Sequence, residues 1–138
     1  MKPKVLVTGR LPDNLISKLS EHCEIEANLE DKPMEMDAIL SSISDKEGLL
    51  SMITDRVDGE LMDRAPRLRI ISQMAVGFNN IDVNAATRRG IAVTNTPGVL
   101  TDATAELAFA LLLAAARRVV EGDRMVREGR FRYWAPLL

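Results

Sequence analysis

The sequence is poor in the residues that most often carry covalent or metal chemistry. Cys23 is the single cysteine among 138 residues, which excludes an intrachain disulfide and a multi-cysteine zinc site. A lone cysteine is typical of a reducing compartment, and we expect the protein to be cytoplasmic. His22 is the single histidine, and it falls at the end of an expected helix. We expect no catalytic role for His22, because it does not lie in any of the strand-end loops where a base could reach a substrate.

Neither sign of charge is in large excess. The chain holds 18 Lys and Arg residues against 20 Asp and Glu residues, so a nucleic-acid partner is disfavoured. One apolar run of ten residues, 107–116, would rise about 15 Å as a helix, half of the roughly 30 Å that a bilayer core requires. The run therefore predicts a buried helix and no membrane span.

The glycines do not form a nucleotide-binding pattern. None of the eight completes a G-x-G-x-x-G motif or a phosphate loop, so the chain has no recognisable nucleotide site of its own. The segment Thr8-Gly9-Arg10, which follows the first expected strand, lacks the acidic pair of a phosphoacceptor site. It also lacks the hydroxyl-rich loop that binds flavin mononucleotide. Asp55 alone supports neither function.

Strand and helix patterns alternate over residues 1–98. Five short runs rich in aliphatic residues indicate strands, namely 4–8, 24–29, 48–53, 68–76 and 91–95. Apolar residues at helical spacing indicate four helices between them. We expect Pro33 to begin the second, Asp58 and Asp82 to cap the third and fourth, and Gly90 to end the fourth. Because parallel strands require crossover helices, this order predicts a flavodoxin-like, doubly wound parallel sheet.

A long apolar helix is expected after residue 98. Thr101 would cap a helix that runs from Asp102 to at least Arg118, with a continuation to Arg127 left open. Apolar residues between positions 107 and 113 lie on every side of this helix, so it needs to be buried all round. A second domain or a second subunit would cover it, and we expect a homodimer with more than about 2,000 Å² of interface.

Ligands of an open parallel sheet bind at the carboxyl ends of its strands. Three expected loops lie there, at 52–55, 75–82 and 95–104. In the second loop, Gly77 has no side chain, so the amides of Val76 and Gly77 could form a small concave site for a carboxylate. The alternative is that Gly77 only makes a turn and Asp82 only caps the next helix. In the third loop, Thr104 could face a ligand or bond back to its own helix.

Four segments together resemble a known enzyme family. They are RLRII at 67–71, AVGFNNID at 75–82, AATRRGI at 85–91 and TNTPGVLTDATAE at 94–106. In this order they resemble the NAD(P)-dependent D-2-hydroxyacid dehydrogenases, and the resemblance covers essentially the whole chain. The form VLTDATAE at 99–106 is most similar to the glyoxylate/hydroxypyruvate reductases of that family.

The resemblance implies roles for individual residues. The Val76 and Gly77 amides would hold the substrate carboxylate, and Met52 would line its pocket. Thr104, together with Val76, would lie beside the NAD or NADP cofactor. Trp134 would match a tryptophan that, in the reductases, reaches into the active site of the neighbouring subunit.

The resemblance also implies parts that this sequence does not contain. Residues 1–98 would be most of the substrate-binding domain, and residues 99–138 a hinge and dimerisation helix with a tail leading toward a missing Rossmann domain. That later region carries the glycine fingerprint, the carbonyl-polarising arginine and the Glu-His pair of the family. We therefore expect an N-terminal fragment, itself inactive, of an enzyme that reduces glyoxylate or hydroxypyruvate with NAD(P)H. The alternatives are a non-catalytic dimerisation or organic-acid-binding module and a phosphoglycerate dehydrogenase fragment.

Overall fold

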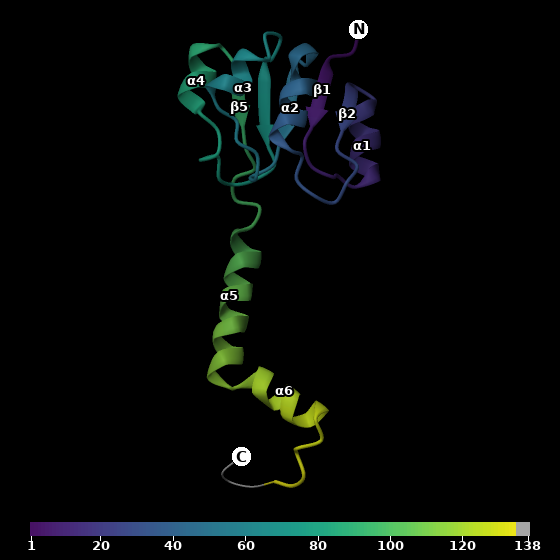
Figure 1. Cartoon of the computed structure of the whole chain (residues 1–138). Helices are drawn as coiled ribbons and strands as arrows, with labels where there is room; N and C mark the ends of the chain where they lie inside the picture. Colours follow the sequence, from purple (N-terminus) through teal and green to yellow (C-terminus); the bar gives the residue numbers. More distant parts are fainter. Residues whose placement is uncertain (135–138) are drawn as a thin grey trace. The chain divides into compact units, whose positions relative to one another are not determined.

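The computed structural model describes residues 1–134, and the chain divides into two compact units, Met1–Gly98 and Val99–Leu138. The first unit is built on a five-stranded, fully parallel sheet with the strand order β2-β1-β3-β4-β5 (Figure 1). Its strands are β1 (Lys4–Val7), β2 (Glu24–Ala27), β3 (Gly48–Ser51), β4 (Ile70–Gln73) and β5 (Ala92–Thr94). The expected parallel α/β fold is confirmed.

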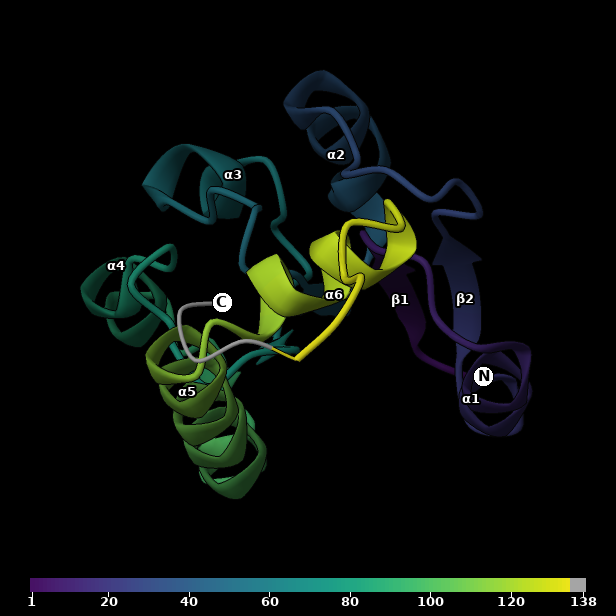
Figure 2. The same ribbon diagram turned by 90° about the horizontal axis from the view of Figure 1, so that it is seen from below.

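Helices cover the two faces of the sheet unequally. They are α1 (Asp13–Ser20), α2 (Met36–Ser42) followed by the 3-10 turn η1 (Ile43–Asp45), α3 (Gly59–Asp63) and α4 (Val83–Arg88). The view along the sheet has α2, α3 and α4 on one face and α1 on the other (Figure 2). This distribution follows from right-handed crossovers, because the chain moves outward from β1 to β2 and then returns to the other side of β1.

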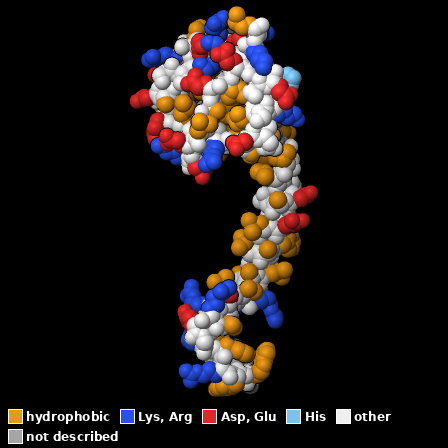
Figure 3. All heavy atoms as spheres, turned by 90° about the vertical axis from the view of Figure 1, so that its right-hand side faces the viewer, with side chains coloured by type: hydrophobic (Ala, Val, Ile, Leu, Met, Phe, Trp, Pro, Cys, Tyr) orange, Lys and Arg blue, Asp and Glu red, His pale blue; other side chains and the backbone are white. Residues whose placement is uncertain are grey.

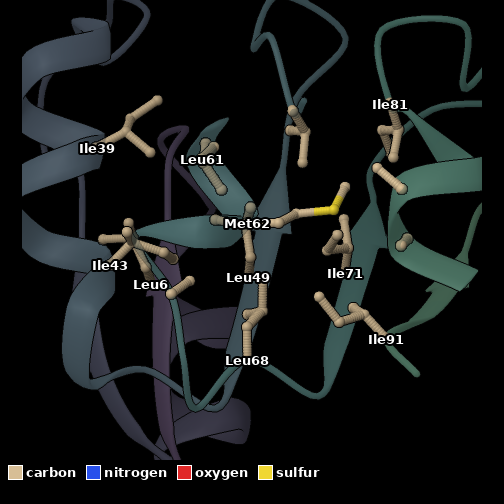
Figure 4. Close-up of a cluster of buried hydrophobic side chains, with 14 residues drawn as sticks. Leu6, Ile39, Ile43, Leu49, Leu61, Met62, Leu68, Ile71, Ile81 and Ile91 are labelled. Atoms are coloured by element: carbon tan, nitrogen blue, oxygen red, sulfur yellow. The ribbon is translucent and has the colours of Figure 1, made fainter. Parts of the chain in front are cut away.

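The apolar core lies between the sheet and helices α2, α3 and α4. Leu6, Leu49 and Ile71 are in register across β1, β3 and β4, so their side chains share one face of the sheet. The helices add buried residues against this row, namely Ile39, Ile43, Leu61, Met62, Ala85 and Ala86 (Figure 4). This core fixes the positions of the strand ends from which the candidate site is built.

In the first unit, three of the four expected helix starts and ends are as predicted. Asp58 Oδ1 accepts a hydrogen bond from the Leu61 amide at 3.1 Å, and Asp82 Oδ1 accepts one from the Ala85 amide at 2.8 Å. Gly90 follows α4 with a φ of 68°, the left-handed conformation that ends helices. The expectation for Pro33 was wrong, since α2 begins at Met36.

A hydrogen-bonded turn precedes Pro33, and residues 33–35 that follow it are not helical. The Asn28 side chain accepts a hydrogen bond from the Glu30 amide and donates one to the Lys32 carbonyl, at 3.0 and 2.8 Å. These bonds stabilise a turn at residues 28–32. Helix α2 then follows Glu35, whose backbone is extended.

The second unit contains two helices, whereas the sequence predicted one helix to at least Arg118 and left its continuation to Arg127 open. Helix α5 (Thr101–Ala116) and helix α6 (Val119–Arg127) are separated at Arg118, which has a φ of 52°. A left-handed residue at this point ends α5. Thr101 is the first residue of α5 and makes no capping hydrogen bond, so its predicted capping role was wrong. Among the described residues, no helix is both long and apolar enough to span a bilayer.

Candidate functional site

The chain leaves the sheet one residue after β4. The Met74 amide donates the last bond to β3, to the Ser51 carbonyl at 2.8 Å, and the loop that follows continues to Asp82. Val76 and Gly77 lie in this loop, beyond the ladder between strands. Within residues 1–134, neither the Val76 amide nor the Gly77 amide has a hydrogen-bond acceptor. We call this pair of amides the amide ledge.

The carbonyl groups around the amide ledge are engaged. The Ala75 carbonyl accepts a bond from the Thr96 amide at 3.0 Å, and the Val76 carbonyl accepts one from Asn95 Nδ2 at 2.8 Å. Gly77 has no positive φ, and a methyl group in place of its α-hydrogen would lie at ordinary distances of 3.5 and 3.8 Å from its nearest neighbours. The loop therefore does not require glycine at this position for steric reasons.

A buried polar network lies behind the amide ledge. Ser51 Oγ donates to Gln73 Oε1 at 2.6 Å, and Gln73 Nε2 donates to Asn80 Oδ1 at 2.9 Å. Asn80 Nδ2 then donates to the Asp55 carbonyl at 2.8 Å and the Met52 carbonyl at 3.2 Å. Because each side chain of this network is paired, it fixes the loop after β4 against the loop after β3.

The loop after β3 is organised by one buried carboxylate. Asp55 is 4% exposed, and its Oδ2 atom accepts a hydrogen bond from the Met52 amide at 2.8 Å and another from the Thr8 hydroxyl. The Met52 side chain lies directly over Gly9, where an added methyl group would come within 2.5 to 2.9 Å of three of its atoms. Gly9 and Asp55 together therefore set the position of Met52.

The two loops also border a hollow. It has a volume of about 370 Å³ and is lined by residues 53–58 and 79–82. A methyl group added at Gly77 would lie within 4 Å of Asn79 and Ile53, two residues of this lining. The hollow thus adjoins the amide ledge, while Met52, Val76 and Gly77 are not among the residues that line it.

The remaining candidates, Thr104 and Trp134, belong to the second unit. Thr104 is in the first turn of α5, and its exposed hydroxyl has no hydrogen-bond partner among residues 1–134, so the bond back to its own helix is not made. Trp134 is 90% exposed. Its ring packs edge-on against Phe131, with centroids 5.3 Å apart at 86°.

A charged cluster lies at the opposite, amino end of the strands. Lys4 begins β1 and donates to Asp45 at 2.7 Å, while the buried Lys46 pairs with Asp45 and with Glu26. Hydrogen bonds from Lys4 and Lys46 lower the pKa of Asp45 to about 2. This cluster stabilises the end of the sheet that is remote from the amide ledge.

Comparison with known proteins identifies the family. Residues 5–125 match the model of the D-isomer specific 2-hydroxyacid dehydrogenase catalytic domain. The chain belongs to this family. It is 51% identical over 139 residues to a glyoxylate reductase of Korarchaeum cryptofilum, covering all of this chain and 42% of that protein. This chain therefore spans about two fifths of the length of that relative.

Solved structures agree with this assignment. The TT0316 protein of Thermus thermophilus is 44% identical with a TM-score of 0.87, and the match covers 98% of this chain and 43% of that one. An NADPH-dependent glyoxylate/hydroxypyruvate reductase of Sinorhizobium meliloti, solved with NADP and malonate, is 29% identical with a TM-score of 0.73. That match covers 99% of this chain and 43% of the reductase.

The residues that hold the loops after β3 and β4 in place were not predicted from the sequence. The sequence predicted no role for Gln73, Asn80 or Asn95. Gln73 and Asn95 donate to the carbonyls of Gly77 and Val76, and Asn80 accepts a bond from Gln73. A polar Gln73 within the apolar run 68–76 was the available signal. A buried glutamine requires a hydrogen-bonding partner, and here its partners are Ser51 and Asn80.

Proposed function

We propose that this chain carries the substrate-carboxylate site of a reductase that acts on small 2-oxo acids, glyoxylate or hydroxypyruvate. The observation that carries this proposal is the amide ledge, in which two adjacent N–H groups have no acceptor within residues 1–134. Adjacent backbone amides form concave sites for anions, and hydrogen bonds to a carboxylate are stronger than those between neutral groups. The identity of 51% to a glyoxylate reductase supports the choice of substrate.

The Val76 and Gly77 amides would bind the two carboxylate oxygens of the substrate. This contact would orient the neighbouring carbonyl carbon, because that carbon is bonded directly to the carboxylate. Met52, held by Asp55 and Gly9, would line the pocket and exclude water from one side of the substrate. The ledge itself donates hydrogen bonds and transfers no proton.

A nicotinamide cofactor would contact this chain at Thr104 and Val76. Both residues fit such a contact, because the Thr104 hydroxyl is exposed and unengaged within residues 1–134 and the Val76 side chain is 41% exposed. NADH or NADPH, when bound, supplies the hydride for reduction of the carbonyl carbon. Residues 1–98 would then be the substrate domain, and residues 99–138 would lead toward the nucleotide-binding domain.

We also propose that α5 pairs with a second copy of the chain, with Trp134 reaching toward the partner's site. Leucines and a phenylalanine at positions 107, 109, 111, 112 and 113 are each 59 to 68% exposed. Figure 3 shows hydrophobic side chains along the surface of this helix.

Sedimentation velocity at micromolar concentration should give twice the 15.2 kDa mass of one chain, and Leu111→Glu or Leu113→Glu should reduce it to one chain. A stable wild-type monomer at that concentration would exclude the pairing.

Titration with glycolate tests the carboxylate site directly. Glycolate is a small 2-hydroxy acid, and we expect it to shift the backbone N–H resonances of Val76 and Gly77 in the nitrogen-15 spectrum of the 138-residue chain. Ethylene glycol, which lacks the carboxylate, is the control and should leave both resonances in place. If glycolate shifts only resonances elsewhere, for example at the amino-end lysines, the proposed site is wrong.

A further inference from the structure

We propose that Asn95 is a positioning residue for the carboxylate site, acting through the peptide group between Val76 and Gly77. Asn95 follows β5, and its Nδ2 atom donates to the Val76 carbonyl at 2.8 Å. This inference rests on the proposed function for its consequence in binding. The orientation that it assigns to the peptide group can be measured without any ligand.

The argument starts from the planarity of the peptide group. None of the described peptide bonds is cis, so the Val76 carbonyl and the Gly77 N–H belong to one plane and point in opposite directions. A donor that fixes the carbonyl therefore also fixes the direction of the N–H. Asn95 holds the Val76 carbonyl on the side of β5, which leaves the Gly77 N–H directed away from that strand.

The loop needs a donor to the Val76 carbonyl, because nothing else in its local structure fixes the plane of this peptide group. Gly77 has a wide choice of backbone angles, and a methyl group at this position would make no close contact, so local sterics do not fix the peptide plane. The next carbonyl, that of Gly77, has only a long 3.4 Å bond from Gln73 Nε2. Within residues 1–134, Asn95 is the one side chain that donates to the Val76 carbonyl.

The same strand end fixes the other half of the ledge. The Thr96 amide donates to the Ala75 carbonyl at 3.0 Å, which sets the direction of the Val76 N–H by the same planarity. Two successive residues after β5, Asn95 and Thr96, thus orient the two successive amides after β4. One of these bonds is made by the backbone, and the Asn95 bond depends on a side chain that substitution can remove.

The experiment compares Asn95→Ala with Asn28→Ala in the 138-residue chain. Asn28 is a control for the coupling, because its side chain also donates to backbone carbonyls, those of Thr8 at 3.0 Å and Lys32 at 2.8 Å, but follows β2 at the other edge of the sheet. The one-bond N–H residual dipolar coupling of Gly77 reports the direction of its N–H. We expect this coupling to change in Asn95→Ala and to remain as in the wild type in Asn28→Ala.

Binding provides the second measurement. The dissociation constant for glycolate should rise roughly threefold to tenfold in Asn95→Ala. Asn95→Asp keeps the size of the side chain and loses the donor, so it should also alter the Gly77 coupling and serves if the alanine variant does not fold. An unaltered coupling and affinity in a folded Asn95 variant would overturn the inference.

The two proposals fail in different ways. If the wild-type chain does not bind glycolate at Val76 and Gly77, the proposed function is wrong, and the coupling measured without glycolate still decides the role of Asn95. If the wild type binds glycolate and the Asn95 variants bind it equally well with an unchanged coupling, the site stands and Asn95 does not position it.

Discussion

Replacing Asp55 with alanine is expected to lower the free energy of unfolding by about 2 to 3 kcal/mol. The carboxylate is buried and accepts hydrogen bonds from the Met52 amide and the Thr8 hydroxyl. Thr8 Oγ1 retains the Leu50 carbonyl as a partner at 3.2 Å, whereas the Met52 amide has no other acceptor within residues 1–134. The main loss is therefore a part-buried amide left without its acceptor, and urea denaturation measures it.

Asp58→Ala is the matched control for this prediction. Asp58 lies three residues further along the same loop and accepts a hydrogen bond from the Leu61 amide at the start of α3. Loss of a helix cap costs about 1 kcal/mol, since water can replace the side-chain acceptor. Asp55→Ala should also release Met52 and weaken glycolate binding, which Asp58→Ala should not. Equal losses in both variants would contradict a special role for Asp55.

The order of the elements was predictable because each depends on local chemistry. Asp58 and Asp82 are short acceptors placed before apolar helical segments, and both cap the helices that they precede. The near-continuous apolar run over residues 68–76 predicted a strand, and β4 lies within it. The ladder nevertheless ends at Gln73, because Ala75 and Val76 bond instead to residues after β5.

The hydrogen bonds that support the candidate site could not be predicted, because they join residues that are far apart in the sequence. The bond between Asn95 and Val76 joins positions 19 residues apart, and the bond between Asn80 and Met52 joins positions 28 apart. Neither pair leaves a local pattern, since each exists only after the strands are in register. The amides themselves could be named from the sequence, because the end of an apolar strand followed by glycine marks a place where backbone groups leave the ladder.

Gly77→Pro is expected to weaken glycolate binding roughly ten- to hundredfold, the effect of losing one hydrogen bond to a charged group. Proline has no N–H, and the Gly77 N–H makes no hydrogen bond within residues 1–134, so its removal takes nothing from the described fold. The φ of Gly77 is not positive, so proline is not excluded by a left-handed backbone. Nuclear magnetic resonance titration gives the affinity, and urea denaturation gives the stability.

Gly77→Ala separates the loss of the N–H from the addition of atoms. Its methyl group would lie 3.5 Å from Asn79 Oδ1 and 3.8 Å from Ile53 Cδ1, both ordinary contact distances, and its N–H is retained. We expect this variant to bind glycolate within about threefold of the wild type, because the charge-assisted bond persists. If the proline and alanine variants bind glycolate equally well, the Gly77 amide is not a ligand of the carboxylate. The anion would then be held by other groups.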